Sequence, residues 1–183
     1  MTYYGAKELA DSFRTVRKNT VQVAEDIPES KYNYKATPET RSVGELLVHI
    51  ATSPTLSEQI HGTEKRTTLE GFDFFAYFGN MMAAEKEPRS KAQVIELLRK
   101  NGDRFAKWME GLDDKFLGER VSFPAGMTPS SKTRFEMLLG SKEHEMHHRA
   151  QLMLIERMLG IVPHLTREME ARIAAMTQAK ATA

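Results

Sequence analysis

One amphipathic run, residues 133–159, constrains the fold of this chain more than any other stretch. Its apolar positions recur at helical spacing, and Gly160 and Pro163 follow it, as is typical of a helix end. Inside the run lies the segment His-Glu-Met-His-His-Arg-Ala-Gln-Leu, residues 144–152, which holds three of the six histidines. The sequence therefore predicts a long helix that carries imidazoles into or beside the core.

His144 and His148 are four positions apart, so on a helix they lie on one face, close enough for both imidazoles to bind one metal ion. The same face carries Met137, Ser141, Gln151, Leu152, Ile155 and Leu159. This face is mostly apolar and is expected to point into the core. A buried histidine is usually just a hydrogen-bonded core residue, but two adjacent imidazoles without a shared partner are costly to bury. Both interpretations stay open, and His147, rotated off this face, is predicted to lie at the surface.

Length and composition exclude several classes of protein. The chain of 183 residues fits one domain, residues 1–183, with a core of its own. Cysteine is absent, so any metal must be bound through nitrogen or oxygen. The 26 basic and 25 acidic residues are evenly spread, which predicts no nucleic-acid or membrane partner. The start lacks the pattern of a signal peptide and no apolar run approaches the roughly 20 residues of a bilayer span, so we expect a cytoplasmic protein.

Three further long helices are predicted from periodicity and from their ends. The first spans about residues 9–26 and stops before Pro28. The sequences Ser-Val-Gly-Glu at 42–45 and Ser-Lys-Ala-Gln at 90–93 have the spacing of capping boxes, so two more helices should begin there. Pro54 predicts a kink in the second helix, where Ser53 could cap the continuation.

The remaining segments are expected to be connections. Residues 29–40 should be an ordered connector, 63–88 a long connection over the core, and 117–132, rich in glycine and proline, a long loop. A short helix is expected at 165–176 and a frayed tail at 177–183. Because the runs left over are short and polar, little sheet is expected, and the fold class predicted is all-α: an up-and-down four-helix bundle with extra short helices and long connections.

A cluster of aromatic and methionine residues lies within the second connection. Its members are Phe72, Phe74, Phe75, Tyr77, Phe78, Met81 and Met82. Packing on the core is the simplest interpretation, while a substrate wall or a dimer face stays open.

A third histidine lies on the second helix. His49 is at the edge of the apolar row formed by Val43, Leu46, Leu47 and Ile50. With His144 and His148 it could close three imidazoles around one divalent ion. Three protein ligands leave a coordination position for water or substrate, which is typical of a reactive site rather than a structural one.

At this point the chain resembles the DinB family of metal-binding bundles, which includes the YfiT-like proteins. Residues 42–50, 144–152 and 159–163 carry the resemblance, with Ala150 where the family more often has glycine. The resemblance implies that His49, His144 and His148 bind one divalent metal ion per chain: zinc, nickel or iron. It also implies a homodimer and a metal-dependent enzyme, a thiol-dependent transferase or isomerase or a hydrolase, that acts on a small molecule.

Three neighbouring residues are candidates for supporting roles. Glu145 is the carboxylate nearest the pair and could be a general base, although a salt-bridged helix residue is the simpler interpretation. Glu45 could orient a ligand histidine, and Gln151 could hold a metal-bound water.

Other readings of the same residues remain. His144 to His148 also matches the His-Glu-x-x-His pattern of zinc proteases, with Glu168 or Glu170 as a third ligand, but such enzymes need a sheet that the sequence does not predict. The Glu-x-x-His pattern ending at His61 suggests a two-metal bundle, yet His61 is 12 residues beyond His49, roughly 18 Å along a helix. A non-catalytic metal-binding or stress-response protein is the third alternative.

Overall fold

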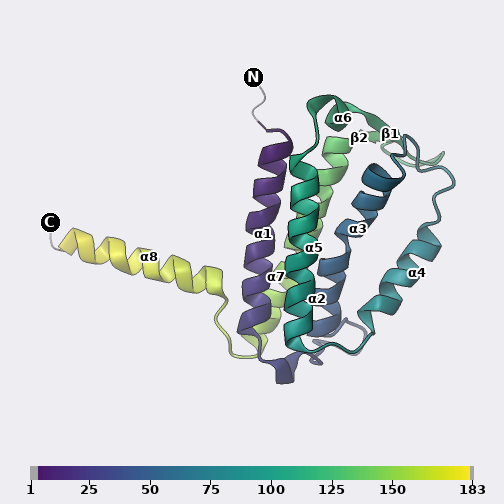
Figure 1. Ribbon diagram of the computed structural model, residues 1–183. Coiled ribbons are helices and arrows are strands. Elements are labelled where there is room, and N and C mark those ends of the chain that lie inside the picture. The colour runs from purple at the N-terminus through teal and green to yellow at the C-terminus, as the bar shows by residue number, and fades with distance from the viewer. Residues whose placement is uncertain (1–3, 182–183) are drawn as a thin grey trace.

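The computed structural model describes residues 4–181, and its main body is a bundle of four helices. These are α1 (Ala6–Asp26), α2 (Val43–Thr52), α5 (Lys91–Glu110) and α7 (Arg134–Met158). Both α1 and α2 pack against α5 and α7, so the four helices close a ring around the core (Figure 1). The predicted all-α four-helix bundle is confirmed.

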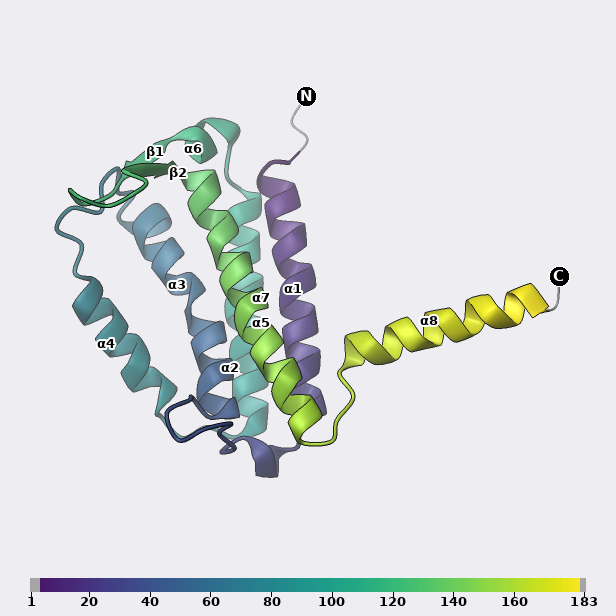
Figure 2. The same ribbon diagram turned by 180° about the vertical axis from the view of Figure 1, so that it is seen from behind.

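The path of the chain differs from strict up-and-down alternation in one respect. Figures 1 and 2 show α1 and α7 running in one direction and α2 and α5 in the other. Two consecutive bundle helices, α2 and α5, are parallel because α4 (Phe74–Glu85) returns the chain along the outside of the bundle, in contact with α2. This outer helix forms one wall of the functional region.

The predicted helix ends are found where the sequence placed them. The Ser42 hydroxyl accepts a hydrogen bond from the Glu45 amide at 3.2 Å, and the Glu45 carboxylate accepts from the Ser42 amide at 2.7 Å. The same capping box opens α5 at Ser90, and Gly160 takes a left-handed φ of 77° just after α7. Each cap satisfies backbone groups that the helix itself leaves unpaired.

The predicted break near Pro54 is confirmed, but its chemistry differs from the expectation. After α2 the chain continues as α3 (Pro54–Ser57) and then as a π-helix, η2 (Glu58–Thr63), which contains His61. Ser53 does not cap this continuation, because its hydroxyl donates instead to the Ile50 carbonyl at 3.2 Å. Helical structure thus runs on past the proline with a local change of pitch.

The connector at 29–40 is ordered, as predicted. It begins with a short 3₁₀ turn, η1 (Glu29–Lys31), and the buried Tyr32 hydroxyl donates to the Ala24 carbonyl at 2.8 Å.

The segment 63–88 is not a simple connection, because most of its second half is α4. Asp73 caps this helix by accepting from the Ala76 amide at 2.8 Å. Phe72 is buried, but Phe75 is 92% exposed, so the aromatic cluster is only partly a core feature.

The long loop expected at 117–132 contains regular structure as well. It begins within α6 (Asp114–Gly118) and includes an antiparallel pair, β1 (Arg120–Ser122) with β2 (Ser131–Thr133). Val121 is fully buried and packs in one cluster with Ile60, Leu69 and Phe72. Strands of three residues are too short to show a period of two in the sequence, which is why the prediction missed them.

The last helix is longer than predicted. α8 (His164–Ala181) runs through most of the segment expected to be frayed, and residues 182–183 lie outside the described part. Its sequence is rich in alanine, glutamate, arginine and methionine, which are strong helix formers. Figures 1 and 2 show α8 extending away from the bundle. Within residues 4–181 no helix combines the length and the apolar character that crossing a membrane requires.

Candidate metal centre

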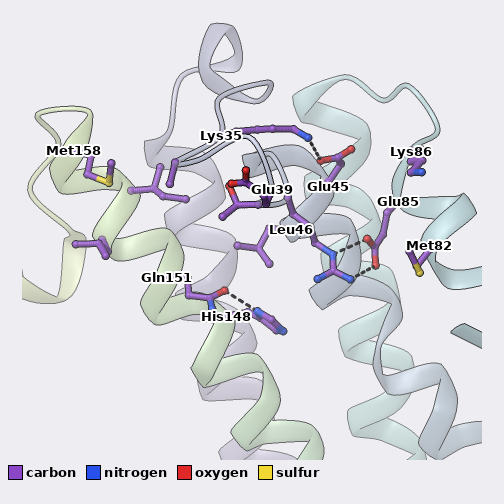
Figure 3. A pocket seen from close by; sticks show the side chains of 15 residues that line it. Lys35, Glu39, Glu45, Leu46, Met82, Glu85, Lys86, His148, Gln151 and Met158 are labelled. Atoms are coloured by element: carbon purple, nitrogen blue, oxygen red, sulfur yellow. Dashed lines mark hydrogen bonds and ion pairs between the residues drawn. The ribbon is translucent and has the colours of Figure 1, made fainter.

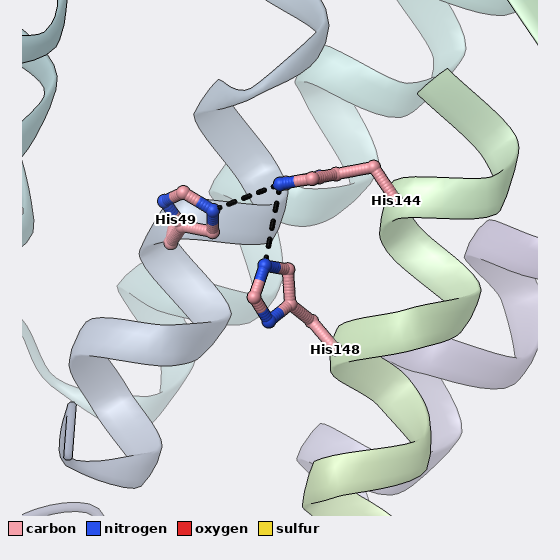
Figure 4. A group of neighbouring side chains, drawn as sticks. All are labelled: His49, His144 and His148. Atoms are coloured by element: carbon pink, nitrogen blue, oxygen red, sulfur yellow. Dashed lines mark hydrogen bonds between the residues drawn. The ribbon is translucent and has the colours of Figure 1, made fainter. Parts of the chain in front are cut away.

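The structure brings His49 of α2 together with His144 and His148 of α7 (Figure 4). The Nε2 atoms of His49 and His144 are 3.1 Å apart, and those of His148 and His144 are 3.2 Å apart. The ligand atoms of all three lie within 4.8 Å of one another, a spacing that allows a shared metal ion. His147 is exposed, as predicted.

The outer ring nitrogens of two of these histidines have fixed partners. His49 Nδ1 lies 2.7 Å from Glu85 Oε1, and His148 Nδ1 lies 2.9 Å from Gln151 Oε1. Carboxylate and amide oxygens accept hydrogen bonds, so in each neutral ring the proton is on Nδ1. The Nε2 atoms of His49 and His148 therefore direct lone pairs at His144.

A cation fits this arrangement better than protons do. His144 Nε2 can donate to only one of its two neighbours, so at least one of the two nitrogen–nitrogen contacts has no hydrogen between its atoms. His144 Nδ1 is also buried without a hydrogen-bond partner among the described residues. Three converging imidazole nitrogens are a donor set that divalent zinc, nickel and iron all accept.

The environment keeps the three imidazoles neutral, which is the form that binds metal. Burial is the main cause in each ring: it lowers the pKa of His144 to about 4 and lowers the pKa of His49 and of His148. Neighbouring histidines and Arg41 act in the same direction. Glu85 opposes the effect at His49, as expected for a carboxylate that stabilises the imidazolium.

Glu85 is the supporting residue that sequence reasoning missed. It lies at the end of α4, is 7% exposed, and also accepts from Arg41 Nε at 2.6 Å. This carboxylate thus fixes the orientation of His49 and is itself held in place. Nothing local in the sequence marks it, since its position depends on how α4 returns along α2.

The two predicted supporting residues are placed differently from the expectation. Glu45 does not reach a ligand ring, because its carboxylate is engaged by the Ser42 amide and lies 3.7 Å from Lys35 Nζ. Gln151 orients His148 directly, with its amide oxygen on that ring and its amide nitrogen 3.2 Å from His147 Nε2.

Glu145 is not placed as a general base. Its carboxylate is 1% exposed and accepts from Arg17 at 2.9 to 3.1 Å, inside the bundle. The next residue along a helix is rotated by about 100°, so Glu145 leaves the face that His144 shares with His148. The salt-bridged interpretation of this residue is the one that the structure bears out.

The zinc-protease interpretation requires Glu168 or Glu170 as a third ligand beside His144 and His148. Glu168 and Glu170 are exposed on α8, which extends away from the bundle and from His144.

The two-metal reading also fails. Arg134 Nη1 lies 2.9 Å from His61 Nδ1, and Glu58 forms a salt bridge with Arg104 at 2.7 Å. Neither residue of that Glu-x-x-His motif joins the three histidines.

Two cavities meet at the histidines. The first, of about 610 Å³, is lined by charged side chains such as Lys35 and Arg41 and by apolar ones such as Leu154 and Met158, and it reaches His148 and Gln151 (Figure 3). The second, of about 360 Å³, lies between α2, η2, α4 and α7 and reaches His49 and His144. Small molecules could therefore approach the three ring nitrogens from two sides.

Comparison with known proteins gives one family. The model of the DinB superfamily matches residues 12–152. No protein with a curated description matches the chain.

Solved structures resemble the chain in fold. A DinB-like protein, YjoA of Bacillus subtilis, is 22% identical with a TM-score of 0.61, over 84% of this chain and 92% of that one. YfiT of Bacillus subtilis, described as a probable metal-dependent hydrolase with an unusual four-helix bundle topology, is 16% identical with a TM-score of 0.67, over 88% and 91%. An uncharacterized protein of Clostridium difficile 630 is 13% identical with a TM-score of 0.65, over 86% and 98%. At these identities the likeness shows the fold alone.

Proposed function

We propose, from the premise that this chain belongs to the DinB superfamily, that it is a metal-dependent enzyme with one divalent ion held by His49, His144 and His148. The observation that carries the proposal is the convergence of three Nε2 atoms. A single hydrogen on His144 Nε2 cannot bridge both of its contacts, with His49 and with His148. Zinc, nickel and iron all suit three neutral imidazoles. A purely structural site would take a fourth protein ligand, and the group found within residues 4–181 has three.

The protein's own residues prepare the centre in three ways. Glu85 and Gln151 hold the His49 and His148 rings so that Nε2 points inward. Burial keeps the three rings unprotonated near neutral pH. The two cavities leave room for a substrate beside the ligands. A divalent ion bound there supplies Lewis-acid chemistry, which activates a nucleophile or polarises a carbonyl or phosphoryl group.

Hydrolysis of a small molecule is the reaction we favour, and the description of YfiT as a probable metal-dependent hydrolase supports it. Transfer of a group to a thiol is the second candidate. Two cavities that meet at one centre favour a reaction between two molecules, and the charged cavity of about 610 Å³ has room for a polar co-substrate.

Metal stoichiometry tests the proposal. Protein purified without a histidine tag, stripped, and reloaded with zinc or nickel should hold about one equivalent per chain by elemental analysis. His49→Ala should weaken metal binding by several kcal/mol while circular dichroism stays unchanged, since one of three ligands is lost and the core is not. Met146→Ala is the matched control, because this side chain is exposed on the same helix as His144 and His148. Two tightly held equivalents, or undiminished affinity in His49→Ala, would contradict the site.

A further inference from the structure

The second cavity lies between α4 and the helices α2 and α7. His49 and His144 line it, and so does His61 of η2, 12 residues beyond His49. Its volume of about 360 Å³ falls in the range of small-molecule sites, which bury most of a ligand in a cleft of this size. One wall is α4, so the aromatic segment faces the space beside the metal ligands.

The lining of this cavity is uncharged. Leu56, Ile60, Phe78, Met81 and Met137 are its apolar side chains, and no aspartate, glutamate, lysine or arginine lines the cavity among the described residues. Apolar walls favour an apolar ligand because burying hydrocarbon is the main gain available there. The other cavity differs in this respect, since lysines, arginine and glutamates line it.

The lining also holds the hydroxyls of Ser53, Ser57, Ser141 and Tyr77, which bond to other groups of the protein. His61 adds a further polar atom but no charge. A guanidinium can only donate, so Arg134 Nη1, 2.9 Å away, requires His61 Nδ1 to accept, and the proton of this ring is on Nε2. Burial, followed by the nearby Arg134, lowers the pKa of His61 to about 4. This part of the lining is therefore neutral near pH 7.

Gly140 keeps space open in the middle of the cavity. It lies within α7, where glycine is less favourable for the helix than alanine, and a Cβ built on it would meet nothing within 4 Å. Close packing of helices therefore does not explain this glycine. A larger side chain here would enter the cavity without a clash.

We propose that this cavity binds the uncharged, apolar body of the substrate, whose polar group would bind to a divalent ion held by His49, His144 and His148. The substrate class is a small molecule with a metal-coordinating group on a hydrocarbon or aromatic chain. The inference rests on the proposed function, because it takes the metal centre as the anchor. The helix α4 is then the wall that selects the chain, through Phe78 and Met81.

A series of hydroxamates on the zinc-loaded protein tests the proposal by calorimetry. Acetohydroxamate, hexanohydroxamate and octanohydroxamate share one metal-binding group and differ only in tail length. Each buried methylene should tighten binding about fourfold, and octanohydroxamate has six more methylenes than acetohydroxamate. Even if only half of them are buried, octanohydroxamate should bind about sixtyfold more tightly. Equal affinities across the series would overturn the inference.

The variant Gly140→Leu tests whether the hydroxamate tail binds in this cavity. It should abolish the gain from the long tail and leave zinc affinity and acetohydroxamate binding unchanged. Gly79→Leu is the matched control, because Gly79 is also helical with nothing within 4 Å of its built Cβ, but it is exposed and does not line the cavity. Unchanged octanohydroxamate binding in Gly140→Leu would overturn this inference but not the proposed function. Failure of the wild-type protein to bind zinc would overturn both.

Discussion

Arg17 of α1 and Glu145 of α7 form an ion pair inside the bundle, with Nη2 and Oε2 2.9 Å apart and side chains 5% and 1% exposed. The same guanidinium donates to the Leu98 carbonyl of α5 at 2.6 Å and to the Ile50 carbonyl of α2 at 3.2 Å. Gly102 makes room for it, since a Cβ there would lie 2.7 Å from Arg17 Cγ. One side chain thus links all four bundle helices.

This ion pair also sets the rotation of α7. Glu145 directly follows His144, so holding Glu145 toward α1 leaves His144 and His148 facing α2. The buried pair is therefore a positioning feature of the metal centre.

Glu145→Gln should destabilise the protein by about 3 kcal/mol, because it leaves the buried Arg17 without a counter-charge. Urea denaturation measures this change. Glu143→Gln, an exposed position on the same helix, should have little effect. Unchanged stability in Glu145→Gln would mean that the buried ion pair does not support the bundle.

Glu85→Gln should weaken metal binding about 10- to 100-fold, since the carboxylate that orients His49 becomes a neutral amide. Competition with a chromophoric chelator gives the affinity. Glu87→Gln, at an exposed residue paired with Arg89, is the control. Equal affinity in Glu85→Gln and the wild type would mean that Glu85 does not support the centre.

Glu156→Gln should stabilise the protein above neutral pH. Glu156 is fully buried, and neither carboxylate oxygen has a hydrogen-bond partner among the described residues. Burial, followed by Asp26, raises its pKa from 4.5 to about 7. Between these values the folded chain binds more protons than the unfolded chain, so this group lowers the free energy of unfolding as pH rises from 4.5 to about 7.

The glutamine amide does not titrate, so Glu156→Gln removes this dependence of the free energy of unfolding on pH. Glu156→Gln should therefore gain about 3 kcal/mol over the wild type at about pH 8 and little at about pH 4. Urea denaturation at both pH values shows the difference. A gain of the same size at both would rule out titration of Glu156 as its cause.

We propose that the chain forms the predicted homodimer and that α8 takes part in it. Met169, Ile173 and Met176 are 57%, 56% and 63% exposed and share one face of this helix. Sedimentation equilibrium at micromolar concentration should give twice the chain mass of 20.8 kDa. The double variant Met169→Lys with Ile173→Lys should give the mass of one chain. If the wild-type protein gives the mass of one chain at every concentration measured, it is not a homodimer.

The bundle helices were predictable because their signals are local. Capping boxes at Ser42 and Ser90 and the glycine after α7 act within one or two turns, so sequence spacing is enough to place them. The facing of His144 and His148 follows from helix geometry in the same way. His49 was joined to them through the family resemblance, not through spacing.

What the sequence could not predict depends on tertiary contacts. Glu85 reaches His49 only because α4 returns along α2. Helix α4 could not be predicted from the aromatic run, because apolar side chains such as Phe75 lie on its exposed face and mask the helical periodicity of the sequence. The role of Glu145 depends on Arg17, which lies 128 positions away in the chain.

The π-helix η2 determines which way His61 faces. In an unbroken α-helix, 12 residues at about 100° each would turn His61 about 120° away from His49. The break at Pro54 and the wider π turn remove part of that rotation, and both residues line the same cavity. A π turn is equivalent to one inserted residue in an α-helix. Deleting a single residue between 58 and 60 should therefore restore ordinary pitch and keep His61 in the cavity, since 11 residues at about 100° each bring it to within about 20° of His49. Converting η2 to α-helical pitch at unchanged length would instead rotate His61 out of the cavity, so the pitch and the length of this segment are coupled.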